Sequence, residues 1–371
     1  MKNQTKKNTN KGLKLMYFLV SILVIIALPF ILIIRALESL LKVNILKIDD
    51  SKKRGIVGTF VVKYWLGNTY EAQKNRVFVY FILPSFTAFS LFVALPFLQG
   101  IYFSMTDWNG LNDPTFIGLD NYKTILHDYS FGYSFYRTVL YSILNIFVIN
   151  IIAFSLALIV TQKLKLQNIY RAGFFLPNLI GGLVLGYIWQ FIFNRVLVQF
   201  GGIFESSLLI NGNTALVGLI IVVTWQYAGY IMMIYIAAIQ NVPQDLIEAS
   251  EIDGANAWQR LRTITLPLVA QAFTVSMFLT LVTSFKQYDT VVSLTHGGPA
   301  TQLPSWLGMI YNKTLLPVVQ STDLIAVNIY DEAFVNRNMG VGQAKSIIFF
   351  IILLVVALIQ VYYNKRKEVE L

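Results

Sequence analysis

Residues 241–267 read NVPQDLIEASEIDGANAWQRLRTITLP, a polar stretch between two long apolar segments. Pro243 suits the start of a helix, and Gly254 can adopt the left-handed conformation that ends one. Asn256 is followed three residues later by Gln259, the spacing of a capping box at the start of a second helix. The stretch therefore predicts two short helices, separated by a glycine, that connect two membrane spans.

The rest of the 371-residue chain is dominated by apolar segments. Hydrophobic residues make up 56% and charged residues 13% of the sequence, whereas a soluble domain carries about 25% charged residues. This composition excludes a soluble enzyme, a disordered chain and a nucleic-acid binder. A bilayer-spanning helix needs about 20 mostly apolar residues. The qualifying stretches are 18–34, 77–101, 138–160, 174–193, 215–239, 269–292 and 346–363. We therefore expect an all-α transmembrane fold with about seven membrane helices.

The basic residues predict the orientation of the chain in the membrane. The net charge is +10, and Lys and Arg favour the cytoplasmic side. Basic clusters follow the third, fifth and last segments, at Lys163, Lys165, Arg171, Arg260, Arg262, Lys365, Arg366 and Lys367. These positions alternate correctly, so the C-terminus is predicted to be cytoplasmic. The long stretches 104–136 and 293–345 are then expected outside.

The N-terminal region gives conflicting signals. Residues 1–17 carry five lysines yet would lie outside, whereas the linker 35–76 carries nine Lys or Arg residues. We place the linker in the cytoplasm, where its mixture of apolar and basic residues suits a helix lying on the anionic inner leaflet. The alternative is that segment 18–34 does not cross and turns back at Pro29. The predicted domains are residues 1–75, a membrane helix with a basic linker, and residues 76–371.

Residues that could carry chemistry are scarce. Cysteine is absent, and the two histidines, His127 and His296, cannot build a histidine metal site. No glycine-rich loop of the Walker type occurs, so any ATP must be hydrolysed by another subunit. We expect no catalytic residue, metal site or cofactor on this chain.

Three parts of the connecting loop resemble a known motif. Glu248-Ala249-Ser250, then Gly254, then residues 264–267 resemble the EAA loop of binding-protein-dependent ABC importer permeases, with Ser250 replacing the second alanine. Stretches similar to the carbohydrate, maltose-type branch occur at 107–110, 116–122, 175–178 and 295–299. The resemblance covers residues 76–371 and implies a permease of a sugar or oligosaccharide importer, with a six-helix core plus one N-terminal helix.

The resemblance also implies partners and a location. In that family the EAA loop is a coupling helix that docks into a cytoplasmic ATPase, present as two subunits or a dimer, which binds the ATP and magnesium. The residues implied in coupling, within loop 243–267, are Glu248, Ala249, Ser250, Asp253, Gly254, Ala255, Leu266 and Pro267. A second homologous permease, an extracytoplasmic sugar-binding protein and membrane lipid are the other expected partners. The implied location is a bacterial or archaeal cell (inner) membrane, with a multi-pass chain.

Polar residues inside the spans are candidates for a solute site. Thr280, Thr283, Ser284 and Gln287 have the spacing of one helical face. Such a face suits a neutral polyhydroxylated ligand or interhelical hydrogen bonds, and both alternatives stay open. Similarity to a maltose-type permease implies sugar contacts at Asn178, Gln226, Tyr227, Tyr230, Thr280, Thr283, Ser284 and Gln287. For Lys286 and Asp289 we expect a mutual ion pair rather than a role in selectivity.

Three other functions, and two roles for the outer loop, remain as alternatives. An ion-coupled secondary transporter would carry carboxylates inside the membrane, and a membrane scaffold or receptor would not need the two-helix loop. A permease of the same class for a non-sugar solute is a further alternative. The outer loop 293–345 is either a docking surface for the delivering protein or a lid folded on the chain's own helices.

Overall fold

The computed structural model describes residues 70–162 and 165–365. Contacts divide the chain into two compact units, with the boundary between Gln99 and Gly100. The predicted membrane segment 18–34 and residues 35–69 of the basic linker lie outside the described residues. The domain boundary at residues 75 and 76 therefore stays a prediction.

The first unit contains the helical segment that leads into the boundary. It consists of α3 (Tyr70–Phe89), the π-helix η2 (Ser90–Ala94) and the start of α4 (Leu95–Phe103). The stretch Phe81–Phe103 is long and apolar enough to cross a membrane. The predicted span at 77–101 is therefore confirmed.

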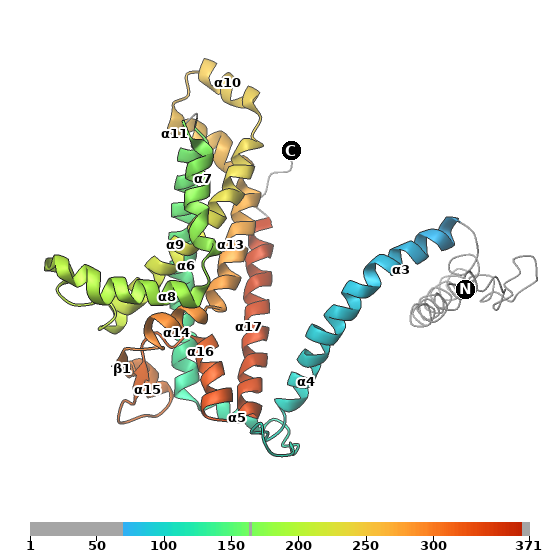
Figure 1. The fold of residues 1–371 in the computed structure, drawn as a ribbon, viewed down its shortest axis with the longest axis vertical. Coiled ribbons are helices and arrows are strands. Elements are labelled where there is room, and N and C mark those ends of the chain that lie inside the picture. Colours follow the sequence, from blue (N-terminus) through green and yellow to red (C-terminus); the bar gives the residue numbers. More distant parts are fainter. Residues whose placement is uncertain (1–69, 163–164, 366–371) are drawn as a thin grey trace, which may run out of the picture. The chain divides into compact units, whose positions relative to one another are not determined.

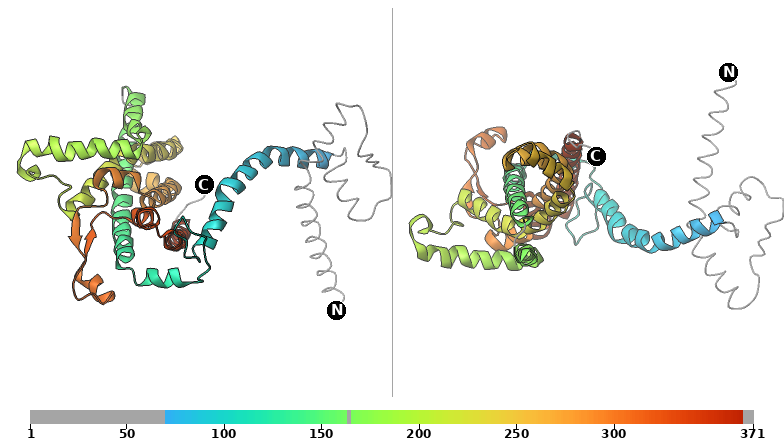
Figure 2. Two further views of the ribbon diagram at one scale, coloured as in Figure 1. Left: turned by 60° about the horizontal axis from the view of Figure 1, so that its bottom comes forward. Right: turned by 90° about the horizontal axis from the view of Figure 1, so that it is seen from above.

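Four long helices form the body of the second unit. They are α6 (Tyr129–Val160), α9 (Gly212–Gln240), α13 (Ala270–Phe285) and α17 (Met339–Lys365), which run alongside one another (Figures 1 and 2). Asp128 caps α6 by accepting hydrogen bonds from the backbone N–H groups of Ser130 and Phe131. Asn211 caps α9 by accepting one from Asn213. These side chains satisfy donors that the first helical turn leaves free.

The fourth predicted span is wrong in its boundaries. Instead of one helix over 174–193, the chain forms α7 (Gln167–Phe175) and the 3₁₀-helix η3 (Leu176–Leu179), then an extended link. Gly182–Phe200 is the stretch that could cross a membrane; it comprises α8 (Gly182–Phe191), η4 (Ile192–Val196) and η5 (Leu197–Phe200). A short 3₁₀-helix, η6 (Gly202–Phe204), follows it. Pro177 and the pair Gly181-Gly182 explain the break, since proline and glycine interrupt helices. Figure 1 shows α8 crossing the long helices.

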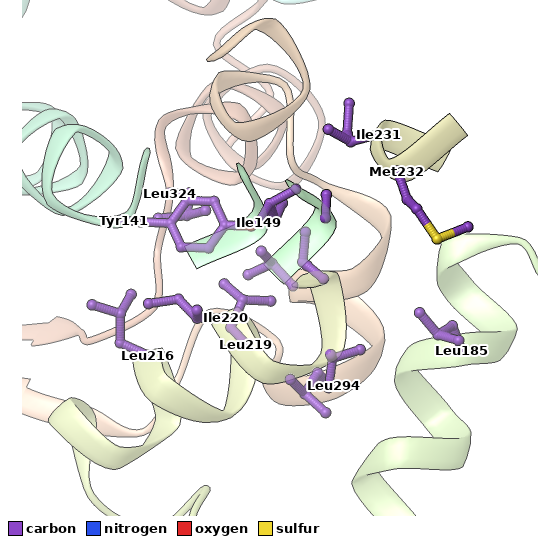
Figure 3. Packing of buried hydrophobic residues seen from close by; sticks show 14 of the residues in the cluster. Tyr141, Ile149, Leu185, Leu216, Leu219, Ile220, Ile231, Met232, Leu294 and Leu324 are labelled. Carbon is purple, nitrogen blue, oxygen red and sulfur yellow. The ribbon is translucent and has the colours of Figure 1, made fainter. Parts of the chain in front are cut away.

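The core of this unit joins α6, α8, α9 and α14 (Asp289–Thr295). Figure 3 shows apolar side chains from these elements directed toward one another. Buried members include Tyr141, Ile149, Leu185, Leu219, Met232 and Leu294. A core made from the middle of the long helices fixes the α9 face on which the candidate solute site lies.

The loop between α9 and α13 forms the predicted pair of short helices. These are α10 (Gln244–Ile252) and α11 (Ala257–Arg260), and the chain returns through η7 (Leu261–Thr265) and α12 (Leu266–Leu268). The axis then bends by 69° into α13. The sixth predicted span is too long at its far end, because α13 stops at Phe285 and α14 starts only at Asp289.

The opposite end of the unit carries a small folded segment. It contains α5 (Asp120–Leu126), β1 (Ala300–Gln302), α15 (Ser305–Ile310), β2 (Val318–Gln320), α16 (Ile325–Tyr330) and η8 (Asp331–Val335). The two strands are antiparallel, with Thr301 opposite Val319. Leu307 of α15 packs with Tyr133 of α6. The buried Arg137 of α6 donates from Nε to the Ser321 carbonyl at 2.6 Å. The segment is therefore folded on this chain's own helices.

The structure confirms the all-α transmembrane class. Five helices in the described residues could cross a membrane, or six if the bent pair at 257–285 counts as one. This agrees with the expected six-helix core, and the additional N-terminal helix lies outside the described residues. Within the described residues, the β-strands are limited to β1 and β2, which form a two-stranded sheet.

Candidate functional site

The first candidate site is the two-helix loop. Gly254 has φ +78° and follows the last turn of α10, where Ala255 N–H donates to the Ser250 carbonyl at 2.9 Å. Asn256 Oδ1 accepts from the Gln259 N–H at 2.9 Å, and Gln259 Oε1 accepts from the Asn256 N–H at 2.7 Å. The predicted helix end and capping box are both confirmed.

An arginine braces the two short helices against each other. Arg260 of α11 donates from Nη1 to the Ala255 carbonyl at 2.9 Å. Its Nη2 lies 3.3 Å from Glu251 Oε1 of α10. Because this guanidinium of α11 contacts Glu251 of α10 and the Ala255 carbonyl in the link, side-chain contacts as well as the glycine turn connect the two short helices.

The loop exposes large apolar side chains. Ile252 is 87% exposed and Trp258 is 67% exposed, at the end of the bundle that carries α10 (Figure 1). Of the predicted coupling residues, Glu248, Ala249, Asp253 and Gly254 are exposed, Ser250 is buried, and Ala255, Leu266 and Pro267 are half-buried. The Ser250 hydroxyl donates to the Ile247 carbonyl at 2.7 Å, so its substitution for alanine leaves no unpaired group. Exposed aromatic and aliphatic anchors are typical of a docking surface.

The second candidate site is a polar cavity of about 220 Å³ between α8, α9 and the α13–α14 break. Four predicted sugar contacts line it: Gln226, Tyr227, Thr283 and Gln287. The lining also contains Gly182, Lys286, Tyr288, Asp289 and Thr290. The first four come from three elements, and their convergence on one cavity supports a solute site.

Two buried polar atoms at this cavity have unused hydrogen-bonding capacity. Gln226 Nε2 donates to the Ile180 carbonyl at 3.1 Å, but its Oε1 has no partner among the described residues. Thr290 Oγ1 is also buried without a partner there. A Cβ on Gly182 would lie 3.0 Å from that hydroxyl oxygen, so the glycine keeps this wall open. Unpaired buried polar groups are costly, so these two atoms are unsatisfied positions in the wall behind the cavity surface.

Two of the predicted contacts pack between helices instead. Thr280 is 1% exposed and accepts from Asn150 Nδ2 at 3.1 Å, while the buried Ser284 accepts from Asn145 Nδ2 at 2.8 Å. Both asparagines lie on α6, so these hydroxyls hold α13 against α6 and do not line the cavity. For this pair the helix-packing alternative describes the structure.

The remaining two predicted contacts also lie apart from the cavity lining. Asn178 is half-buried in η3, and Tyr230 is 36% exposed on α9, one turn beyond Gln226. The proposed role of these two side chains in solute contact therefore lacks support from the geometry of the single chain.

The sequence reasoning missed several lining residues. Lys286, Tyr288 and Asp289 lie at the helix break, and the expected ion pair is absent: within the described residues no ion pair joins Lys286 to Asp289. Both charged side chains are exposed at the cavity. A run of polar residues from Lys286 to Asp289 inside an apolar segment was the available signal for a break.

A buried charge cluster lies at the end of the unit opposite α10. Lys345 Nζ of α17, 1% exposed, lies 2.7 Å from Asp128 Oδ2 and 2.8 Å from Glu332 Oε2, and donates to Asn328 Oδ1 at 3.0 Å. Asp323 Oδ2 accepts from Ser134 at 2.6 Å and from Asn328. The cluster ties α6, α16, η8 and α17 together.

Comparison with known proteins defines the class of this chain. The family model described as binding-protein-dependent transport system inner membrane component matches residues 149–369. The chain therefore belongs to this family, which confirms the resemblance drawn from the EAA loop. Such a chain is a transport permease subunit of an ABC importer, spans the membrane several times and is not itself an enzyme.

Relatives with descriptive names include sugar permeases. A probable starch degradation products transport system permease protein of Thermoanaerobacterium thermosulfurigenes is 44% identical over 80% of this chain and 97% of its own length. A trehalose/maltose transport system permease protein of Thermococcus litoralis is 28% identical over 74% of this chain and 88% of its own length. Among solved structures, a bacterial ABC transporter that imports alginate has a TM-score of 0.65 at 19% identity, covering 79% of this chain and 96% of that one. This structural likeness shows the fold.

Proposed function

We propose that the chain is the permease of a sugar or oligosaccharide importer, with the solute bound in the cavity at Gln226 and Gln287. The cavity carries this proposal: its amide, hydroxyl and phenol groups are neutral, and the charges of Lys286 and Asp289 sum to zero. Such a lining suits a neutral ligand rich in hydroxyl groups.

The names of two relatives support the sugar assignment. One is named for starch degradation products and the other for trehalose and maltose. The first is 44% identical along almost its whole length. We infer that this chain takes a solute of the same kind, a glucose-based sugar or its short oligomers.

The two-helix loop is proposed to couple transport to ATP hydrolysis. Its apolar side chains Ile252 and Trp258 are exposed on two short helices that the Arg260–Glu251 ion pair connects. A cleft on a partner protein can bind these side chains. The proposed partners are an ATPase dimer or two ATPase subunits, which carry ATP and magnesium, and a second homologous permease that completes the translocation path. An extracytoplasmic sugar-binding protein delivers the solute. On this proposal α10 and the C-terminus are cytoplasmic, and residues 293–338 lie on the outer side.

The docking assignment is tested with a pair of matched variants. Ile252 and Leu315 are 87% and 88% exposed and lie in α10 and in the segment folded on the other end of α6, respectively. Ile252→Asp places a charge in the proposed interface and should remove the ATPase subunit from the purified complex. Leu315→Asp adds the same charge elsewhere and should leave the ATPase bound. Equal retention of the ATPase by both variants would contradict the docking role.

Loss of coupling without loss of assembly is expected from a milder change. Glu248→Lys reverses an exposed charge on α10 and should abolish sugar-stimulated ATP hydrolysis while the protein still reaches the membrane. Wild-type stimulation in this variant would show that α10 does not transmit the signal.

A second candidate solute follows from Lys286. Its ammonium lines the cavity, and no ion pair neutralises it within the described residues. A small anionic solute would pair with it. Lys286→Met separates the two candidates, because it should leave neutral sugar uptake within a few-fold of wild type but abolish uptake of an anion.

A further inference from the structure

Three aromatic side chains form a continuous strip that starts at the cavity. We define the aromatic strip as Tyr288, Tyr330 and Phe334. The ring centroids of Tyr288 and Tyr330 are 5.0 Å apart, and those of Tyr330 and Phe334 are 4.8 Å apart. Tyr288 also lines the cavity. The strip therefore extends the candidate solute site along α16 and η8.

The strip leads from a half-buried ring to open surface. Tyr288 is half-buried, Tyr330 is 41% exposed and Phe334 is 57% exposed. Exposed aromatic rings present an apolar face with partial negative charge, which attracts the slightly positive C–H bonds on the face of a sugar ring. Because neighbouring rings partly cover one another at these separations, each ring offers a sugar the part of its surface that stays exposed.

The local backbone holds the strip in place. Tyr330 and Phe334 are four residues apart at the junction of α16 and the π-helix η8, where Asn336 N–H donates to the Asp331 carbonyl at 2.8 Å. The buried Ala333 packs so closely on Gly342 of α17 that a Cβ there would lie 2.7 Å from the Ala333 Cβ. With Ala333 turned inward, Phe334 projects outward. Single π-helical turns often occur at functional sites.

The size of the cavity leaves a role for the strip. The cavity measures about 220 Å³, whereas pockets that enclose larger organic ligands measure roughly 300–1,000 Å³. On the proposed function, a space below that range takes a single sugar unit on this chain. Any further units of a linear oligosaccharide must extend beyond the cavity, and the strip is the aromatic surface continuous with it through Tyr288.

We propose that the aromatic strip binds the second and later units of a linear oligosaccharide whose first unit occupies the cavity. This inference rests on the proposed sugar function and adds that the ligand is a chain of sugar rings read by its length. Tyr330 and Phe334 are then specificity residues that favour longer chains over single sugars.

The test measures uptake of a length series by the complete transporter. Proteoliposomes containing the full complex and its binding protein are given glucose, maltose, maltotriose and maltopentaose, with Tyr330→Ala or Phe334→Ala compared with wild type. Because the binding protein is the same in every sample, the variant-to-wild-type ratio at each length isolates the permease. We expect a ratio near one for glucose, whose single unit lies in the cavity. For maltose, maltotriose and maltopentaose we expect a loss of about 2- to 12-fold, the range of a single aromatic contact.

Conservative and neighbouring variants complete the design. Tyr330→Phe keeps the ring and should retain length selectivity, and Val335→Ala, at a 67% exposed position of the same π-helix, should behave as wild type. A loss of uptake that is equal at all sugar lengths would contradict the binding of later sugar units by the strip. An equal defect in Tyr330→Phe and Tyr330→Ala would contradict it as well. Release of the second permease from Phe334→Ala would also overturn it, because the strip would then be a subunit contact. Failure of wild type to take up any sugar would instead reject the proposed function.

Discussion

Asp323 has a raised pKa although a lysine lies in the same cluster. Burial, with a smaller contribution from the nearby Asp331, raises the pKa of this carboxyl to about 6 against the opposing hydrogen bonds and Lys345. The lysine has little effect because Asp128 and Glu332 already pair with it directly. Asp323 Oδ1 has no partner among the described residues. The cluster thus holds more carboxylates than one ammonium can neutralise.

This raised pKa gives a pH dependence with a defined sign. The folded state binds the Asp323 proton more tightly than the unfolded state does, so stability increases as pH falls from 7 through about 6 toward 5. The difference between a pKa of about 6 and the model-compound 3.8 corresponds to about 3 kcal/mol. Asp323→Asn should remove this contribution. We expect the melting temperature of wild type to rise relative to the variant between pH 7 and pH 5.

The test compares how the melting temperatures of wild type and Asp323→Asn change with pH. Asp128, Asp331, Glu332 and Lys345 face Asp323 and are present in both, so their own titration cancels to first order. Parallel pH profiles for wild type and variant would show that Asp323 is ionised throughout this range.

Substitutions of Gln287 and Thr280 should have different effects, on uptake and on stability respectively, although both residues were predicted sugar contacts. Gln287 lines the cavity, whereas Thr280 bonds to Asn150. Gln287→Ala should weaken uptake by roughly 5- to 150-fold, the effect of losing about 1–3 kcal/mol of hydrogen bonding to the solute, with the complex intact. Thr280→Ala should lower the melting temperature of the complex and leave sugar preference unchanged. Uptake kinetics and thermal melts of both variants measure the contrast, and a shift of sugar preference in Thr280→Ala would reverse the assignment.

The sequence could predict the shared helical face of Thr280 and Ser284, but not the separate position of Gln287. Their spacing places Thr280 and Ser284 on one helical face, but Gln287 shares it only if the helix continues. Because α13 stops at Phe285, position 287 is free of that constraint. The polar Asn145 and Asn150 within the apolar segment 138–160 were the signal that the hydroxyls of α13 had partners inside the bundle.

At the scale of elements, one glycine sets how closely two helices approach. A Cβ at Gly229 of α9 would collide with the carbonyl oxygen of Phe174 in α7. The same two residues line an apolar cavity of about 410 Å³. The backbone of α7 can therefore lie against α9 only if position 229 has no side chain.

A matched pair of glycine variants checks this contact. Gly229→Ala should destabilise the protein by about 1–3 kcal/mol, because one helix must move away from the other. Gly173→Ala, in the facing α7, meets no atom within 4 Å of its new methyl group. It should be neutral or stabilising by about 0.5–1 kcal/mol, since alanine favours a helix. Thermal melts of the purified complex report both, and equal melting temperatures would refute the close contact.

Element boundaries were predictable where side chains cap the backbone locally. The capping box at Asn256 and the glycine end of α10 need only neighbouring residues, and both are confirmed. The extended link after η3 and the break after Phe285 lie inside apolar runs. Average hydrophobicity counts such runs as spans, so the signals for the two breaks are local: Pro177 and Gly181-Gly182 for the first, and the polar run 286–289 for the second.

At the scale of the whole molecule, residues 293–338 form a folded segment. Leu307 packs with Tyr133, and Arg137 of α6 binds the Ser321 carbonyl. These contacts support the lid alternative. Leu315 is nevertheless 88% exposed and Met309 72% exposed, so the same segment presents apolar side chains to a partner. The predicted docking role for the delivering protein stays a prediction.

The 69° bend at Val269 joins the proposed coupling loop to α13. Val269 is fully buried between the 257–268 stretch and α13, and Arg260 stiffens the loop on the other side. The 16 residues of α13 span about 24 Å at about 1.5 Å per residue, so a tilt of about 5° at this pivot would carry Phe285 by about 2 Å. Hydrogen bonds fail over such a distance. On the proposed coupling role, a displacement of α10 that leaves every helix intact would therefore be enough to break hydrogen bonds between the cavity and a solute.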